Sequence, residues 1–237
     1  MAGKLYGLGV GPGDPELITL KALRVLQQVP VVAVPVSRHG EDSLALTVAK
    51  SHLRPEQEII TLQMPMSRDQ ECLEKAWEAA AGRLLEKLGK GLDVAFLTLG
   101  DASLYSSYSY LMEKVGELES GVEIETVPGV TSFAAAAARL NQPLAKGDEP
   151  LAVVPLLEDP EVLGELLPHF SNMVLMKVAR RYDEIVRVLK ENGRAENAVL
   201  ISRCGLDGEI VSRDLDEGIG KKHDYLTAII VKGAESK

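Results

Sequence analysis

Cysteine is scarce in this sequence, and so are long apolar runs. Cys72 and Cys204 are the only cysteines among 237 residues, and their separation predicts neither a disulfide framework nor a metal site. No apolar stretch approaches the roughly 18 residues that a membrane span requires, and the first residues resemble a strand more than a secretory signal. We therefore expect a cytoplasmic protein with no membrane segment and no resident metal.

Aromatic residues and basic charge are sparse as well. Aromatic side chains make up 4% of the residues, and the formal net charge is -9. Proteins that bind nucleic acids usually carry a basic surface, and those that bind single strands add aromatic platforms. The composition therefore argues against nucleic acid as a partner. The hydrophobic content of 46% is ordinary for a globular protein with a buried core.

Short apolar runs alternate with helical patterns along the first two thirds of the chain. Strands are expected at residues 5–10, 31–36, 58–62, 94–99 and 122–127, and helices at residues 15–28, 43–52, 69–90, 104–115 and 131–140. This alternation predicts an α/β fold with a mostly parallel sheet that is covered on both faces.

Proline, glycine and polar residues cluster at residues 141–150 and interrupt this pattern. Beyond them, strands are expected at residues 151–155, 173–177, 199–202, 209–213 and 225–231, and a helix at residues 183–191. A loop with glycine and lysine joins the last two strands and predicts an antiparallel edge. We therefore expect two α/β domains, residues 1–145 and 146–237.

A glycine-rich loop, residues 7–14 (Gly-Leu-Gly-Val-Gly-Pro-Gly-Asp), joins the first expected strand to the first expected helix. The dinucleotide-binding pattern G-x-G-x-x-G fails, because its third glycine falls on Pro12 or Asp14 and no acidic residue ends the second strand. The Gly-Lys-Ser/Thr of a P-loop is also missing. Two interpretations remain: a tight turn that needs positive φ, or a ligand site at the carboxyl end of a parallel strand. Asp14 is also well placed to cap the helix that follows.

Three segments stand in a characteristic order and spacing. They are residues 9–22 (Gly-Val-Gly-Pro-Gly-Asp-Pro-Glu-Leu-Ile-Thr-Leu-Lys-Ala), residues 97–106 (Leu-Thr-Leu-Gly-Asp-Ala-Ser-Leu-Tyr-Ser) and residues 127–132 (Val-Pro-Gly-Val-Thr-Ser). Together they resemble the tetrapyrrole methylase family, over nearly the whole chain. The family's second motif usually reads Gly-Asp-Pro. Ala102 replaces the proline here, which removes rigidity but no hydrogen-bond donor.

The resemblance implies a bilobal α/β fold that holds S-adenosylmethionine in the cleft between its two domains, and a homodimer. Within the family, residues 103–108, 125–133 and 176–180 look like the branch that methylates a meso carbon. The implied reaction is methyl transfer to C-20 of precorrin-2 or cobalt-factor II in corrin ring biosynthesis, which releases S-adenosylhomocysteine. Uroporphyrinogen III methylation, diphthine-type protein methylation, ribosomal-RNA methylation and a non-catalytic binding module are the alternatives.

The resemblance also places the cofactor against residues from both domains: Pro12, Leu99, Gly100, Asp101, Leu104, Thr131, Ser132, Met176, Lys177, Cys204, Gly205, Thr227 and Ala228. Some of them have simpler explanations. Asp101 suits a turn, Thr131 or Ser132 suits a helix cap, and Met176 suits core packing. Cys204 has no neighbour in the sequence that would activate it, so we interpret it as part of the wall of the site.

The substrate of such an enzyme is rich in carboxylates, and basic residues outnumber acidic ones between Lys177 and Arg203. Arg180 and Arg181 follow a strand end, and together with Lys177 they are expected to bind substrate carboxylates. Arg187, Lys190 and Arg194 are expected to form the solvated face of a helix. In the first domain, Gly11, Gly13 and Asp14 are expected to contact the substrate.

Methyl transfer of this kind can draw most of its acceleration from the positioning of the two reactants. A base must also remove the meso hydrogen. Asp14, Asp101, Tyr105 and Tyr108 are weak candidates for this role, and the sequence does not rank them.

Overall fold

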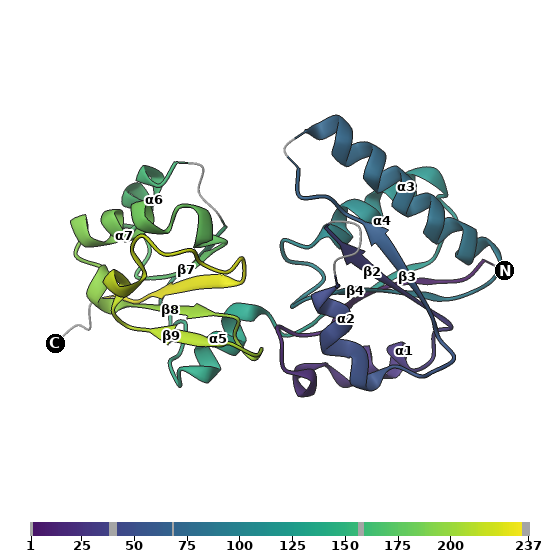
Figure 1. Cartoon of the computed structure of the whole chain (residues 1–237), viewed down its shortest axis with the longest axis horizontal. Coiled ribbons are helices and arrows are strands. Elements are labelled where there is room, and N and C mark those ends of the chain that lie inside the picture. Colours follow the sequence, from purple (N-terminus) through teal and green to yellow (C-terminus); the bar gives the residue numbers. More distant parts are fainter. Residues whose placement is uncertain (1, 38–41, 68, 156–158, 234–237) are drawn as a thin grey trace. The chain divides into compact units, whose positions relative to one another are not determined.

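The computed structural model describes residues 2–37, 42–67, 69–155 and 159–233. Its contacts divide the chain into two compact units, residues 1–131 and 132–237, each built on a five-stranded sheet (Figure 1). The division precedes the alanine-rich helix α5 (Ser132–Arg139), whereas the sequence pattern placed it after that helix, at residue 145. The reason is packing, because Ala136 and Ala137 of α5 contact Ile201 and Ile230 in the second sheet.

The first unit contains the predicted parallel sheet. Its strand order is β3 (Glu58–Gln63), β2 (Val31–Val36), β4 (Val94–Thr98), β1 (Leu5–Gly9) and β5 (Ile124–Val127), and all pairs are parallel. Nearly every residue of β2 is buried, as expected for a strand covered on both faces.

Helices cover both faces of this sheet. Figure 1 shows α1 (Leu20–Leu26) and α2 (Leu44–Ala49) on one side, and α3 (Gln70–Gly89) and α4 (Ser107–Leu118) on the other. The core under α3 and α4 includes Trp77, Leu84, Phe96 and Tyr108. A short 3-10 turn, Lys50–His52, extends α2.

The helix predicted for residues 15–28 is in fact two helices. A 3-10 turn covers Pro15–Leu17, and α1 begins only at Leu20. Between them Ile18 and Thr19 are extended, with ψ values of 137° and 146°. The break forms because Thr19 caps α1: its Oγ1 accepts a hydrogen bond from the amide of Ala22 at 3.2 Å. The regular leucine spacing across this segment concealed that cap.

The second unit has a mixed sheet in the order β6 (Leu151–Val154), β7 (Asn172–Met176), β10 (Thr227–Val231), β8 (Ala198–Ser202) and β9 (Ile210–Ser212). β6 and β7 are parallel, while β10 is antiparallel to both of its neighbours. The prediction that the last two strands form an antiparallel edge was wrong for β10. Its Ile229, Ile230 and Val231 are buried on both faces, so the strand takes the centre, and β9 alone forms the antiparallel edge.

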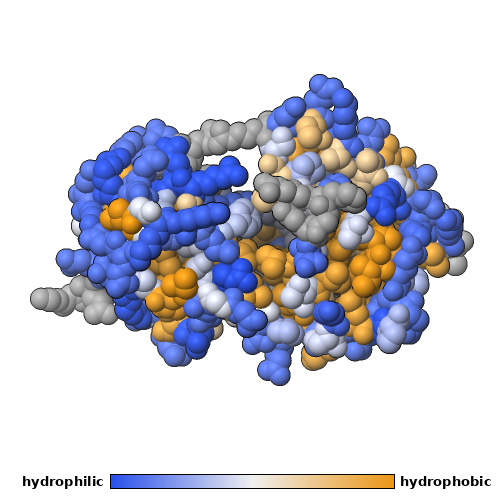
Figure 2. All heavy atoms as spheres, in the orientation of Figure 1, coloured by the Kyte–Doolittle hydropathy of each residue, from blue (hydrophilic) through white to orange (hydrophobic). Residues whose placement is uncertain are grey.

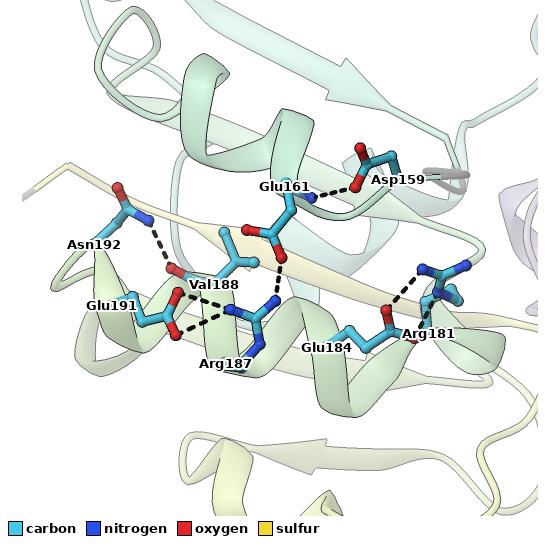
Figure 3. Close-up of polar contacts among 8 residues, drawn as sticks. All are labelled: Asp159, Glu161, Arg181, Glu184, Arg187, Val188, Glu191 and Asn192. Atoms are coloured by element: carbon cyan, nitrogen blue, oxygen red, sulfur yellow. Dashed lines mark hydrogen bonds and ion pairs between the residues drawn. The ribbon is translucent and has the colours of Figure 1, made fainter.

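Helices α6 (Glu161–Leu166) and α7 (Tyr182–Glu191) pack on one face of the second sheet, and α5 packs on the other. The sequence reading missed α6. Short 3-10 turns occur at Val178–Arg180, Ala195–Asn197 and Leu215–Gly218. In Figure 3, Arg187 lies between Glu161 of α6 and Glu191 of α7, and its Nη1 is 2.9 Å from Glu191 Oε2.

Two of the three basic residues predicted on a solvated helix face do lie there. Arg187 and Lys190 are exposed on α7, and each forms an ion pair, Lys190 with Asp216. Arg194 differs, because α7 has already ended. Its Nη1 donates to the carbonyl of Leu167 at 3.2 Å and its Nη2 to the carbonyl of Ser171 at 2.6 Å. Arg194 therefore fastens the segment that precedes β7.

In Figure 2, hydrophilic residues cover most of the visible face of the second unit, whereas hydrophobic residues form a broad area on the first unit. Leu20 and Met66, exposed by 84% and 65%, contribute to the apolar surface of that unit. Among the residues that the structure describes, no helix is both long and apolar enough to cross a membrane.

The break before α1 can be tested with two helix caps. We expect Thr19→Ala to lower the free energy of unfolding by about 1 kcal/mol, because the first turn of α1 loses its cap. Ser43→Ala should cost less or be neutral, because Ser43 Oγ precedes α2 buried and without a hydrogen bond to any described residue. Urea unfolding of both variants measures the difference. Equal losses would contradict the assignment of Thr19 as a cap.

Candidate functional site

Three loops meet at the carboxyl edge of the first sheet, after β1, β4 and β5. Gly11 and Gly100 exchange backbone hydrogen bonds, with N–O distances of 3.2 and 2.7 Å. A Cβ atom on Gly9 would lie 2.6 Å from the carbonyl oxygen of Gly100, and one on Gly129 would lie 2.2 Å from the same atom. Such distances are too short for any side chain, so the loops can meet only as bare backbone. This edge is also where parallel sheets commonly bind ligands.

Asp101 holds two of these loops together. It is buried, and its Oδ2 accepts a hydrogen bond from the amide of Gly129 at 2.7 Å. Its Oδ1 accepts from the amide of Ser103 at 2.8 Å and also from the Ser103 hydroxyl. Burial pushes the pKa of Asp101 upward, but these hydrogen bonds outweigh it and hold the pKa below its usual value. The carboxylate is therefore charged and fixed in place, which suits a structural role better than proton removal.

The loop after β4 is longer than predicted, because α4 starts at Ser107 and not at residue 104. Ser106 caps α4 by accepting a hydrogen bond from the amide of Tyr108 at 3.1 Å. Ala102 is fully buried in this loop. Tyr105 has a positive φ of 50° and is 46% exposed.

The structure places the other predicted residues of the first unit around these loops. Gly11, Pro12 and Gly13 are buried, and Leu99, Leu104 and Thr131 are half-buried. Asp14 caps the first 3-10 turn through a hydrogen bond from the amide of Glu16 at 2.9 Å, as its position predicted.

Tyr108 belongs to the core of the first unit. Its ring lies over Gly7, where an added Cβ would meet the ring carbon Cζ at 2.1 Å. Its hydroxyl is 3.2 Å from Thr126 Oγ1, and burial raises the pKa of Tyr108. This packing fits a core residue better than a catalytic one.

In the second unit, the predicted cofactor residues occupy the edge where β7 and β8 end and β10 begins. Met176 and Ala228 are direct antiparallel partners, so their side chains share one face of the sheet. Cys204 and Ala228 pack on the same cluster as α5, which includes Ala137 and Ile230. The structure thus brings Met176, Cys204 and Ala228 to one face as a small apolar surface.

Thr227 points to the opposite face. Its Oγ1 lies 2.9 Å from Ser202 Oγ and donates to the carbonyl of Asp224 at 2.7 Å, and the residue is 1% exposed. The side chain is therefore committed to the fold, although its backbone still borders Ala228.

A cavity of about 460 Å³ lies on this opposite face of the second sheet. Its walls include Tyr182, Ser202, Arg203, His223 and Asp224, and none of the residues predicted for the site. Arg203 is paired with Asp224 at 3.1 Å, and His223 Nε2 is 2.9 Å from the carbonyl of Gly218. The residues that line the cavity come from separate segments of the chain, and no sequence motif predicted it.

The basic residues predicted to bind substrate differ in their surroundings. Arg180 is exposed, and Lys177 has a left-handed backbone (φ 58°) directly after β7. Arg181 forms an ion pair with Glu184 on the first turn of α7, with Nη2 donating to Oε2 at 2.7 Å (Figure 3). The two residues stand three apart, a spacing at which ion pairs form on helices, although this pairing was not predicted.

Neither cysteine has a disulfide partner. Burial raises the pKa of the Cys204 thiol, which agrees with a residue of the wall and not with a nucleophile. Within the described ranges, no group of three or more His, Cys, Asp or Glu residues is arranged to hold a metal ion.

Comparisons with known proteins agree with this architecture. The family model described as Tetrapyrrole (Corrin/Porphyrin) Methylases matches residues 4–217. The chain is 39% identical to a cobalt-precorrin-2 C(20)-methyltransferase of Salmonella typhimurium, over 92% of this chain and 90% of the relative. It is 38% identical to a probable cobalt-precorrin-2 C(20)-methyltransferase of Methanocaldococcus jannaschii, over 97% and 96%. A precorrin-2 C(20)-methyltransferase of Sinorhizobium is 30% identical, over 98% and 96%.

Solved structures show the same fold. A cobalt precorrin-4 methyltransferase superimposes with a TM-score of 0.72 at 26% identity and covers 97% of this chain and 94% of its own. The uroporphyrin-III C-methyltransferase of Thermus thermophilus, in complex with S-adenosylhomocysteine, gives 0.67 at 25% identity and covers 97% of both chains.

Asp101→Asn tests the role of that carboxylate. An asparagine would turn an N–H group toward one of the amides that Asp101 accepts from, so we expect a loss of about 1–3 kcal/mol in the free energy of unfolding at neutral pH. Because the pKa of Asp101 is lower in the folded protein than in the unfolded chain, its carboxylate stabilises the fold at any pH above the unfolded-state pKa, which is about 4. This stabilisation is lost as the pH falls through the folded-state pKa. The difference between wild type and variant should therefore shrink below about pH 4. Urea unfolding from pH 7 downward measures it, and a pH-independent difference would contradict the assignment.

Proposed function

The chain belongs to the tetrapyrrole (corrin/porphyrin) methylase family, and from this premise we propose that it transfers a methyl group from S-adenosylmethionine to C-20 of a precorrin-2 substrate in cobalamin biosynthesis. The observation that carries the proposal is the 39% identity to a C(20)-methyltransferase over 92% of the chain. The relatives named for the cobalt-bearing substrate are 38–39% identical, against 30% for the one named for precorrin-2. We therefore favour the cobalt-bearing form as substrate.

The residues of both units fit the cofactor. In the first unit, Gly11 and Gly100 bond to each other through their own amides and carbonyls, so what they offer a ligand is a loop edge without side chains. In the second unit, Met176, Cys204 and Ala228 form a small apolar surface that suits the flat face of an adenine ring. We assign the cofactor to these residues, to Pro12, Leu99, Asp101 and Leu104, and to Thr131, Ser132, Lys177, Gly205 and the backbone of Thr227.

S-adenosylmethionine supplies a methyl group on a positively charged sulfur, so the leaving group is already activated. What remains for the protein is to hold the two reactants in line, which can contribute most of the acceleration. The close junction of Gly9, Gly100 and Gly129 gives this unit a rigid rim for that task. Asp101 and Tyr108 are buried in the fold, so we place the proton acceptor at Asp14 or Tyr105, which are more exposed.

The carboxylates of the substrate need cationic partners. We assign Arg180 and Lys177 to them, with Gly11, Gly13 and Asp14 as contacts from the first unit. Arg181 would have to exchange Glu184 for the substrate, which makes it a weaker partner than the exposed Arg180. We also propose a homodimer in the cytoplasm, since the family resemblance implies the dimer and the scarcity of cysteine suits a reducing compartment.

The proposed function predicts a defined product. The protein is incubated anaerobically with S-adenosylmethionine and, separately, with cobalt-factor II, precorrin-2 and uroporphyrinogen III. We expect mass spectrometry to show one added methyl group and NMR to place it at C-20, with the cobalt-bearing substrate reacting fastest. Methylation of uroporphyrinogen III alone would assign the chain to another branch of the family. Cofactor binding without any methylation would contradict an enzymatic role on these substrates.

A further inference from the structure

The loop between β8 and β9 carries two of the proposed cofactor residues, Cys204 and Gly205. Three of its residues have positive φ angles: Arg203 at 54°, Gly205 at 76° and Gly208 at 80°. For arginine this backbone conformation is uncommon and unfavourable, and it persists only where the surroundings hold it. The loop therefore needs an anchor.

Arg203 itself bonds to the carbonyl of Asp207 and to Asp224, and Glu209, the last residue before β9, anchors the Gly205 part of the loop. Its Oε2 accepts a hydrogen bond from the amide of Gly205 at 2.9 Å, and its Oε1 is 2.7 Å from Nε of Arg139. The Glu209 side chain is 18% exposed, while that of Arg139 is 65% exposed. The Gly205 amide, and after it Arg139, hold the pKa of Glu209 below its usual value, so the carboxylate is charged. Bonds of this kind are stronger than those between neutral groups.

The two partners of Glu209 belong to different parts of the proposed cofactor surface. Arg139 is the last residue of α5, the helix that begins at Ser132, while Gly205 follows Cys204 in the loop after β8. A single carboxylate thus connects the helix that carries Ser132 to the loop that carries Cys204. All of these contacts lie within the second unit.

We propose that Glu209 is a positioning residue for the cofactor: it fixes the Gly205 amide and thereby the conformation of the loop from Arg203 to Gly208, while Arg139 holds the carboxylate in place. The inference rests on the proposed function, because it takes this loop as part of the cofactor site. Glu209 and Arg139 are thereby expected to affect the binding of the cofactor and not the binding of the tetrapyrrole.

Calorimetric binding of S-adenosylhomocysteine tests this role without any tetrapyrrole. We expect Glu209→Ala to weaken binding by about tenfold or more, since a charge-assisted hydrogen bond to the loop is lost. Glu209→Gln should lose less, because its amide oxygen can still accept from Gly205, and Arg139→Gln should also lose less. Glu191→Gln is the matched control, since Glu191 also pairs with an arginine but holds no loop amide.

Steady-state kinetics separate positioning from a general loss of structure. Glu209→Ala should raise KM for S-adenosylmethionine while kcat, KM for the tetrapyrrole and the thermal unfolding midpoint stay near those of the control. A Glu209→Ala variant that binds S-adenosylhomocysteine as tightly as the wild type would overturn the inference. So would a loss of affinity that is matched by a lower thermal unfolding midpoint. If the wild type itself does not bind S-adenosylhomocysteine, the proposed function fails. If it binds but methylates none of the substrates, only the substrate assignment fails.

Discussion

The close contact of three glycines at the carboxyl edge of the first sheet is the constraint on which the rest of the site depends. Gly9 and Gly129 both approach the carbonyl oxygen of Gly100 so closely that neither could carry a Cβ atom. Asp101 stabilises the same junction by accepting a hydrogen bond from the Gly129 amide. The loops after β1, β4 and β5 are thereby held in close backbone contact, with no side chains between them.

The second unit also holds its proposed cofactor residues in place, but it does so with side chains. Its edge presents a small apolar surface at Met176, Cys204 and Ala228, and Glu209 holds the loop that carries Cys204. In each unit a charged carboxylate at the proposed site accepts a hydrogen bond from a glycine amide, Asp101 from Gly129 and Glu209 from Gly205. Both carboxylates have lowered pKa values. The two surfaces are therefore already formed by contacts within their own unit.

Much of the fold follows from the sequence, because apolar runs and helical periods are local signals. The parallel sheet of the first unit and most strands of the second were predicted within a few residues. The break before α1 was missed because Thr19 sits in an otherwise regular leucine pattern. The central place of β10 and the assignment of α5 to the second unit depend on contacts between distant segments, which a local pattern cannot report.

The sequence predicted which residues form the candidate site better than it predicted how their side chains are arranged. The family resemblance named the loops, but the sequence did not reveal that Asp101 is fully engaged or which face of the sheet Thr227 takes. These properties depend on register and on side-chain partners. Glu209 and Arg139 were missed because they lie outside the motifs and meet only in the folded chain.

The most direct measurement of the central claim is S-adenosylhomocysteine affinity together with the urea unfolding curve of Gly129→Ala. A methyl group at this position must push the loops apart, so we expect a loss of about 1–3 kcal/mol in stability and clearly weaker binding. Gly82→Ala, on an exposed turn of α3 with nothing within 4 Å, is the control and should be neutral or stabilising. A Gly129→Ala protein that binds and unfolds like the control would contradict the account.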